Sequence, residues 1–219
     1  MREKLIIDWL EGQRTGERGI TLTKDQLHLL SRFQELVLEK NKKMNLTAIT
    51  SDEDFAVKHF IDSFTLLSFL PQGKFSLLDI GTGAGFPGVP LKIARPDLHL
   101  VLLDSVGKRI DFLQDALETL GVKAEYLHTR AEDIPRLLPG VLFDVITARA
   151  VARLDKLCKY ALPLLDTDGI FLAMKGPDVA DELEEAADAL KKYGGVVREV
   201  TCPLLEDKLR HTIVVIEKC

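Results

Sequence analysis

The residues best suited to bind a ligand form a glycine-rich turn preceded by an acid. Residues 79–85 read D-I-G-T-G-A-G and follow directly on the apolar run 76–78. The run is typical of a buried parallel strand, and the carboxyl end of such a strand is where open α/β sheets bind ligands. Glycine lacks a Cβ, so the backbone turns sharply and lies close to a bulky ligand. The turn therefore favours a nucleotide-like ligand over an ordinary tight turn, which is the alternative.

The spacing of the glycines distinguishes between two kinds of nucleotide-like ligand. A dinucleotide fingerprint, G-x-G-x-x-G, needs a glycine at position 86, where this chain has Phe86. The acid two positions before the first glycine is instead typical of enzymes that use S-adenosylmethionine. That cofactor carries an ammonium group, which a carboxylate attracts, and no pyrophosphate, which a carboxylate repels. We therefore expect Asp79, Gly81, Gly83 and Gly85 to lie against S-adenosylmethionine.

Two further strand ends carry candidate contacts to the same cofactor. Asp104 ends the next apolar run, 23 positions after Gly81, and an acid about 20 residues on accepts hydrogen bonds from ribose hydroxyls. Its alternative role is a helix N-cap. Ala131 and Glu132 lie in the turn after the third apolar run. In enzymes with an S-adenosylmethionine-binding sheet of this kind, that turn usually contacts the adenine. Acids there are also explained by the dipole of a following helix.

The fourth apolar run ends in Arg149, where a methyltransferase keeps its reactive-site residues. The run lacks the Asp/Asn-Pro-Pro-Tyr tetrad of exocyclic amine methylation and a cysteine nucleophile. An arginine stays protonated and cannot act as a base, but it binds carboxylate or phosphate bidentately and stacks on bases. A surface arginine is the alternative. With Arg153, Lys156 and Lys159 it forms either a basic stripe or a solvated helix face.

The elements that position these residues change character along the chain. The first 70 residues are helical in pattern, with a short apolar face at residues 5–10, a capping box of Thr23 and Gln26, and apolar positions at helical spacing after it. A second helix is predicted from near Ser51 to Pro71. We therefore expect an N-terminal helical extension, residues 1–71, and an S-adenosylmethionine-binding domain, residues 72–219.

From residue 75 onward, strands alternate with helices, which predicts a parallel sheet covered on both faces. The last two strands, 196–201 and 212–216, have no helix between them and read as an antiparallel hairpin. A terminal hairpin on a mostly parallel α/β sheet fits the Rossmann-like class I methyltransferase fold better than a dinucleotide-binding fold. The other predicted strands are 76–80, 99–103, 124–128, 143–148 and 169–174.

The composition excludes several functional classes. The 219 residues are 46% hydrophobic and 29% charged, an ordinary globular balance, and no stretch of about 18 apolar residues would span a membrane. The start of the chain shows no cleavage signal. Three scattered cysteines predict a reducing cytoplasm and no zinc site. A net charge of −5 argues against bulk nucleic-acid binding, so any RNA-binding face must be local.

These motifs together resemble the bacterial small-subunit ribosomal RNA methyltransferase G family, also called glucose-inhibited division protein B. The resemblance covers most of the chain, and the glycine loop followed by Phe86-Pro87-Gly88 is its strongest part. The motifs that carry it are Asn45-Leu46-Thr47, His59-Phe60-Ile61-Asp62-Ser63, Asp79 to Gly88, Asp104-Ser105 with Lys108-Arg109, Arg130-Ala131-Glu132, Ala148-Arg149-Ala150 and Lys175-Gly176. Thr82 stands where serine is common.

The resemblance implies methyl transfer from S-adenosylmethionine to N7 of a guanine in the 530 loop of 16S ribosomal RNA. It assigns cofactor contacts to Gly81, Phe86, Ala131, Glu132 and Arg149. Guanine N7 carries a free lone pair, so we expect no strict catalytic base and a positioning role for Arg149. The implied partner is 16S ribosomal RNA or the small-subunit particle. Candidate RNA contacts are Lys42, Lys43, Asn45, Thr47, His59, Arg153 and Lys175, although a lone helical histidine is more often structural.

Three other functions compete with this interpretation. A methyltransferase of the same fold that acts on a small molecule or a protein is the first alternative, and the helical segment with Asn45 and His59 argues against it. A dinucleotide-dependent oxidoreductase conflicts with the missing glycine at position 86. A non-catalytic RNA-binding module has no use for a complete glycine loop. The oligomeric state is not determined by these patterns.

Overall fold

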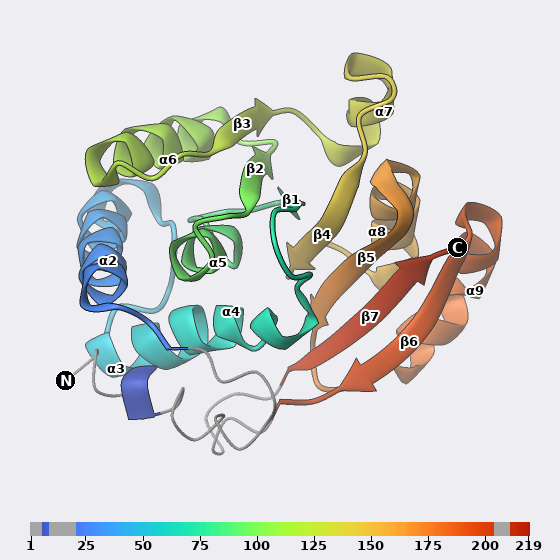
Figure 1. Cartoon of the computed structure of the whole chain (residues 1–219), viewed down its shortest axis with the longest axis horizontal. Helices are drawn as coiled ribbons and strands as arrows, with labels where there is room; N and C mark the ends of the chain where they lie inside the picture. Colours follow the sequence, from blue (N-terminus) through green and yellow to red (C-terminus); the bar gives the residue numbers. More distant parts are fainter. Residues whose placement is uncertain (1–5, 9–20, 204–210) are drawn as a thin grey trace.

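A seven-stranded sheet forms the centre of the computed structural model, which describes residues 6–8, 21–203 and 211–219 (Figure 1). The strand order is β3-β2-β1-β4-β5-β7-β6. Strands β1 to β5 are parallel, and β7 runs antiparallel to both β5 and β6. The expected class I methyltransferase sheet with a terminal antiparallel hairpin is therefore confirmed. The strands are β1 (Ser76–Ile80), β2 (His99–Asp104), β3 (Glu125–His128), β4 (Phe143–Arg149), β5 (Leu165–Lys175), β6 (Gly195–Thr201) and β7 (Thr212–Lys218).

Two apolar layers cover the sheet because successive strand side chains point to opposite faces. In β1, Leu77 packs into one buried cluster and Leu78 into the other. Helices α2 (Lys24–Met44), α5 (Gly88–Ala94) and α6 (Gly107–Leu120) cover the first face. Helices α7 (Ile134–Leu137), α8 (Leu154–Ala161) and α9 (Ala180–Tyr193) cover the second. The interior positions of the central strands are therefore mostly apolar, as a parallel sheet covered on both faces requires.

The first long helix begins as its sequence predicts. The Thr23 side chain accepts from the Gln26 N–H at 3.2 Å, and the Gln26 side chain accepts from the Thr23 N–H at 2.8 Å. The Gln26 amide also donates to the carbonyl of Ile93 at 2.8 Å, so the capping residue ties α2 to α5. At the other end, Asn45 takes the left-handed conformation that stops the helix.

The second helical segment is not the single regular helix that its apolar spacing predicts. It consists of α3 (Asp52–Phe55), a π-helical turn (Ala56–Ile61) and α4 (Asp62–Phe64), followed by a short 3-10 turn at Leu67–Phe69. A π-helix has a wider hydrogen-bonded ring than an α-helix and is frequent at functional sites. The sequence pattern does not reveal this π-helical turn, because over a single turn the spacing of its apolar residues is close to that of an α-helix.

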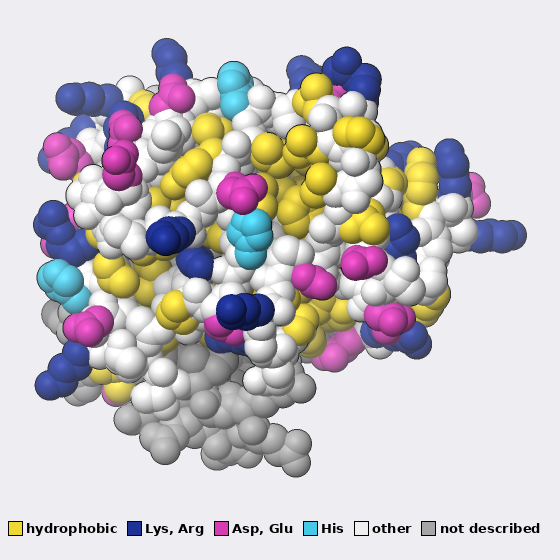
Figure 2. All heavy atoms as spheres, turned by 45° about the horizontal axis from the view of Figure 1, so that its top comes forward, with side chains coloured by type: hydrophobic (Ala, Val, Ile, Leu, Met, Phe, Trp, Pro, Cys, Tyr) yellow, Lys and Arg dark blue, Asp and Glu magenta, His cyan; other side chains and the backbone are white. Residues whose placement is uncertain are grey.

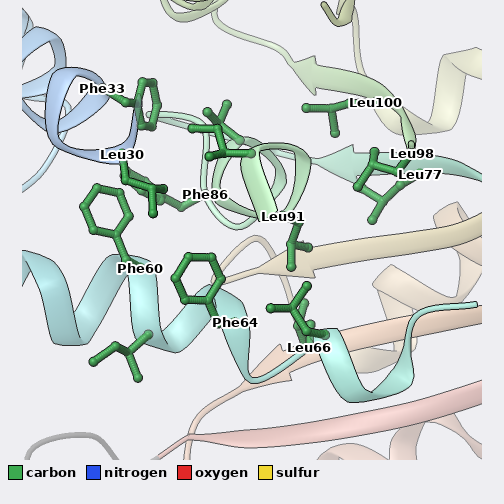
Figure 3. Close-up of a cluster of buried hydrophobic side chains, with 14 of the residues drawn as sticks. Leu30, Phe33, Phe60, Phe64, Leu66, Leu77, Phe86, Leu91, Leu98 and Leu100 are labelled. Carbon is green, nitrogen blue, oxygen red and sulfur yellow. The ribbon is translucent and has the colours of Figure 1, made fainter. Parts of the chain in front are cut away.

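The N-terminal helices share one apolar core with the sheet. Leu30 and Phe33 of α2, and Phe60 and Phe64 of the second segment, belong to the same buried cluster as Leu77 of β1. In Figure 3 the cluster extends from Leu30 and Phe33 at the left, past α5, to Leu77 at the right. The division at residues 71 and 72 stays a prediction, since both parts contribute to this cluster. The predicted apolar face at residues 5–10 lies largely outside the described residues. Within the described residues, no helix has the length and apolar character needed to cross a membrane.

Because α2 packs into the common core, removing a buried α2 side chain should destabilise the whole protein. Leu30 is 1% exposed, and Leu30→Ala should lower the free energy of unfolding by about 2–5 kcal/mol. Leu137 is 51% exposed, and Leu137→Ala should stay within about 0.5 kcal/mol of the unchanged protein. Urea unfolding followed by circular dichroism gives both values. Two separate transitions in the unchanged protein would contradict the shared core.

Candidate functional site

The carboxyl ends of β1 to β4 gather at one edge of the sheet, as the parallel registers require. Ile80 of β1 lies beside Leu103 of β2 and Ala148 of β4, and Asp104 lies beside His128 of β3. The loops after these four strands enclose a cavity of about 330 Å³. The sequence-predicted residues Gly81, Asp104, Ala131 and Glu132 line it, and Tyr160 of α8 lines it as well.

The glycine loop is fixed to the neighbouring strand by its own backbone. The N–H groups of Gly81 and Thr82 both donate to the Leu103 carbonyl, at 2.8 and 2.9 Å. The Gly83 N–H donates to the Asp104 carboxylate at 3.0 Å. The loop is therefore held in one defined position across the end of β2.

Gly83 and Gly85 serve different purposes although both have positive φ. A Cβ on Gly83, at φ +60°, would meet no protein atom closer than 3.9 Å. A Cβ on Gly85 would approach buried side chains of Leu113, Val89 and Phe33 at 2.9–3.0 Å. A side chain at Gly83 would thus meet open space, which we call the cradle, whereas Gly85 lets the loop pack against the core. Gly83 itself does not line the cavity, and a close approach of S-adenosylmethionine to its backbone stays a prediction.

Asp104 both holds the loop and faces the cavity. Its buried carboxylate accepts from the Gly83 N–H and from the Val106 N–H at 2.8 Å, and Arg109 lies 3.3 Å away. Arg109 Nη1 also lies 3.5 Å from the other carboxylate oxygen, so these contacts already occupy the roughly four acceptor positions of a carboxylate, and the ribose contact stays a prediction. The N-cap alternative is wrong, because the N-cap of α6 is Val106 and no side chain caps that helix; Asp104 instead accepts from the Val106 N–H just before the helix.

Asp79 is turned into the protein beneath the loop. Its carboxylate accepts from the Thr82 hydroxyl at 2.6 Å and from the Gly88 N–H at 3.0 Å. Complete burial raises the pKa of Asp79 to about 6, although both hydrogen bonds oppose that shift. The side chain therefore ties the loop to the first residue of α5. A direct contact between this carboxylate and the cofactor stays a prediction.

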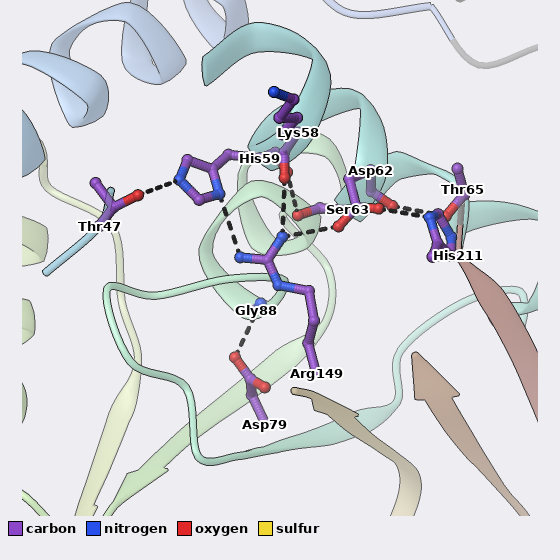
Figure 4. Close-up of polar contacts among 10 residues, drawn as sticks. All are labelled: Thr47, Lys58, His59, Asp62, Ser63, Thr65, Asp79, Gly88, Arg149 and His211. Carbon is purple, nitrogen blue, oxygen red and sulfur yellow. Dashed lines mark hydrogen bonds and ion pairs between the residues drawn. The ribbon is translucent and has the colours of Figure 1, made fainter. Parts of the chain in front are cut away.

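The Arg149 guanidinium leaves the end of β4 toward the N-terminal helices, as Figure 4 shows. Nη1 donates to the Asp62 carboxylate at 2.7 Å and to the Lys58 carbonyl at 3.1 Å, and Nη2 lies 3.2 Å from His59 Nδ1. Its plane lies over the Phe86 ring, 5.4 Å from the centroid. Arg149 is therefore not an isolated surface arginine, and its contacts come from the second helical segment and from the end of the glycine loop.

His59 has a defined protonation state because both ring nitrogens have partners. An arginine only donates, so Nδ1 must accept from Arg149, and the ring proton then lies on Nε2, 2.9 Å from the Thr47 hydroxyl. Burial, and then the adjacent Arg149 cation, lower the pKa of His59 to about 3. The ring also stacks on Phe86 at 4.3 Å. His59 is therefore a neutral acceptor that orients Arg149, and it is 6% exposed.

The remaining predicted RNA contacts differ in how they are placed. Lys42, Lys43 and Asn45 are exposed at the end of α2. Arg153 pairs with Glu185 at 2.6 Å. Lys175, whose side chain is 9% exposed, pairs with Glu182 at 2.7 Å and donates to the Ala152 carbonyl at 2.6 Å.

Lys42, Lys43 and Asn45 thus form an exposed group close together in the chain, while an RNA contact of any candidate stays a prediction. Figure 2 shows basic and acidic side chains interspersed on the face that it displays, with no broad basic surface there.

Sequence reasoning missed two side chains that complete this region. Asp62 stands out in the sequence only as part of a motif, yet its carboxylate contacts Arg149. His211, directly before β7, lies with Nδ1 2.8 Å from Asp62 Oδ1. The signal that could have found Asp62 is its position three residues after His59, which places both on one side of a helical turn. Nothing in the sequence around His211 indicates this contact. Among the described residues, no group of three His, Cys, Asp or Glu side chains is arranged to hold a metal ion.

The family model and the sequence relatives agree on a single family. Residues 26–213 match the family model described as GidB, rRNA small subunit methyltransferase G. A protein of that name from Pelotomaculum thermopropionicum is 43% identical over 95% of this chain and 88% of its own length. One from Desulfitobacterium hafniense is 44% identical over the same shares. Among solved structures, magnesium protoporphyrin IX methyltransferase from Synechocystis with bound SAM has a TM-score of 0.59 at 11% identity, covering 85% of this chain and 97% of that one. This last likeness concerns the fold alone.

The depressed pKa of His59 has a measurable consequence for stability. Between pH 3 and 6.5 the unfolded chain binds more protons at this residue than the folded protein, so stability falls as the pH is lowered through that window. Relative to His59→Gln, which does not titrate, the wild type should lose about 2 kcal/mol between pH 7.5 and pH 5. Urea unfolding of both proteins across pH measures the difference. Asp79 titrates in both proteins, so its effect cancels, and a pH-independent difference would contradict a neutral His59.

Proposed function

Because the chain belongs to the rRNA small subunit methyltransferase G family, we propose that it methylates N7 of a guanine in the 530 loop of 16S ribosomal RNA, using S-adenosylmethionine. The family makes the protein an S-adenosylmethionine-dependent rRNA methyltransferase. The observation that carries the proposal is the open glycine loop beside Asp104 at the cavity, in a chain that matches its relatives over most of its length. An rRNA substrate also implies a cytoplasmic enzyme.

The residues at the sheet edge suit the binding of this cofactor. The cavity offers Asp104 for ribose hydroxyls, and Ala131 and Glu132 at the turn that follows β3. Tyr160 adds an aromatic side chain to the same cavity. Gly83 lets a ligand approach the backbone without meeting a side chain. When bound, S-adenosylmethionine supplies a methyl group made electrophilic by its positively charged sulfur.

Arg149 supports this chemistry by position. N7 of guanine carries a lone pair in the plane of the base and no proton, so the site needs alignment and no general base. The three hydrogen bonds to Asp62, Lys58 and His59 leave part of the guanidinium's donor capacity of five N–H groups unused. The remaining donors suit a carboxylate of the cofactor or a phosphate of the RNA. His59, which stays neutral and faces Arg149, is unsuited to act as a base.

The form of the substrate is part of the proposal. We propose that the enzyme acts on the 530 loop of 16S ribosomal RNA, either as RNA or within the small-subunit particle, since loop guanines expose edges that proteins can reach. The exposed residues Lys42, Lys43 and Asn45 are the candidates for contact with RNA phosphates. Their small number is consistent with an acidic protein that binds RNA over a local area.

Gly83→Val tests the placement of the cofactor, and Gly73→Val is a matched control. Both glycines have positive φ, and a Cβ would meet nothing closer than 3.9 Å at Gly83 and nothing within 4 Å at Gly73. The Gly83 N–H binds Asp104, which lines the cavity, whereas Gly73 lies before β1. Each substitution should cost about 1–2 kcal/mol of stability through backbone strain. Gly83→Val should in addition weaken S-adenosylmethionine binding by at least about tenfold, measured by calorimetry, because its side chain fills the cradle. Equal affinities in the two variants would place the ligand elsewhere.

Arg149→Lys tests the proposed reaction and the role of the guanidinium together. The wild type, incubated with labelled S-adenosylmethionine and small-subunit particles that lack the modification, should label one guanine in the 530 loop. N7-methylguanine is located by borohydride and aniline cleavage. Lysine keeps the charge and loses the planar fork, so the variant should methylate the same guanine at least about tenfold more slowly. Label at an exocyclic amine, or full activity in the variant, would contradict the proposal.

A further inference from the structure

We propose that Asp62 and His211 are positioning residues that hold Arg149 for methyl transfer, so that the last strand of the sheet is linked to the reactive edge. The inference rests on the proposed function in one respect, the use of Arg149 in the reaction. It assigns a role to two side chains that do not line the cavity.

Asp62 joins two partners with its two carboxylate oxygens. It is 4% exposed, with Oδ2 bound by Arg149 Nη1 at 2.7 Å and Oδ1 2.8 Å from His211 Nδ1. A buried carboxylate is stable only when nearby cations and donors replace its hydration. Asp62 therefore fixes the position of the guanidinium that it contacts, and both partners in turn limit where Asp62 can move.

His211 acts on Arg149 through this carboxylate alone. The ring is buried, Nε2 has no hydrogen-bond partner among the described residues, and the contact of Nδ1 with Asp62 is close but poorly aligned for a hydrogen bond. The ring therefore acts by occupying the space beside Oδ1 and by placing a polar nitrogen there. Without it, the carboxylate is free to rotate away from the guanidinium. Figure 4 shows His211 on the far side of Asp62 from Arg149.

Anchoring of the terminal hairpin does not require this contact. Strand β7 is paired along its length with β5 on one side and with β6 on the other. Arg149 pairs with Met174 of β5, and Met174 pairs with Ile213 of β7. His211 therefore lies at the same edge of the sheet as Arg149, two strands away. The Asp62 carboxylate lies between the two side chains and contacts both. A role limited to holding β7 in place would not need a buried charge.

The test measures coupling between these residues and Arg149. Asp62→Asn keeps the shape and removes the charge, His211→Leu removes the ring nitrogens, and His211→Asn restores a nitrogen donor at the position of Nδ1. Each is made alone and with Arg149→Lys. Single-turnover methylation of small-subunit particles, at saturating cofactor, is measured for all. The affinity for S-adenosylhomocysteine, the urea unfolding midpoint and the Nε–H NMR signal of Arg149 are measured in parallel.

If Asp62 and His211 act through Arg149, Asp62→Asn and His211→Leu should each slow methylation by about tenfold in the native background and by less than about twofold in Arg149→Lys. His211→Asn should recover most of the rate. The Arg149 Nε–H signal should shift or broaden in the two damaging variants without particles present. Equal rate losses in both backgrounds, or an unchanged Arg149 signal, would overturn the inference.

Failure of the inference and failure of the proposed function give different results. If the wild type does not methylate the particle, the proposed function fails, while the Arg149 signal and the S-adenosylhomocysteine affinity still report whether Asp62 and His211 position Arg149. If Arg149→Lys slows methylation but His211→Leu does not, the proposed function stands and the inference is wrong. Losses of unfolding stability without loss of rate would assign the pair a structural role only, which also overturns it.

Discussion

The guanidinium of Arg149 is mostly buried at the end of β4, and the surrounding structure has to compensate its charge. A buried cation is tolerated only where acceptors replace water. Here the acceptors are the Asp62 carboxylate, the Lys58 carbonyl and the His59 ring, all from the second helical segment. The N-terminal helices thus do more than cover one face of the sheet. They supply the groups without which an arginine at this strand end would be unstable.

The irregular shape of that segment follows from the same requirement. The π-helical turn Ala56–Ile61 presents a backbone carbonyl, from Lys58, and a side chain, from His59, to one guanidinium. Stacking of His59 on Phe86 joins the turn to the residue that ends the glycine loop. A charged imidazole would repel Arg149, so the arrangement is stable only while His59 is neutral. The contact between His59 and Arg149 therefore requires the low pKa of His59, which the buried surroundings and the Arg149 cation produce.

Two buried carboxylates give the ligand-binding loop its shape. Asp104 binds the Gly83 N–H from the side of β2, and Asp79 binds Thr82 and the Gly88 N–H from below. These contacts hold the loop in one conformation, which reduces the entropy that ligand binding would otherwise cost. They leave the space beside Gly83 open.

The sequence alone determined the class of fold, the cofactor and the residues at the strand ends. Apolar runs alternating with helical patterns specify a parallel sheet, and parallel strands bring their carboxyl ends together, so Gly81, Asp104 and Glu132 were predictable. The sequence also indicated the final hairpin, because no helix separates its strands. These features are predictable because they depend only on the order of apolar and helical segments along the chain and on the rule that parallel strands end at the same edge of a sheet.

Only the tertiary structure decided how the polar side chains are used. Asp79 turned inward, Lys175 paired with Glu182, and His59 became buried against Phe86. Asp62 and His211 are far apart in the sequence and meet only because β7 returns beside β5. Whether a polar side chain is buried, and which group it pairs with, depends on which segments distant in the sequence pack against it. The type and spacing of the residue therefore predicted where it would lie along the sheet, but not whether it would face the ligand, the solvent or another charge.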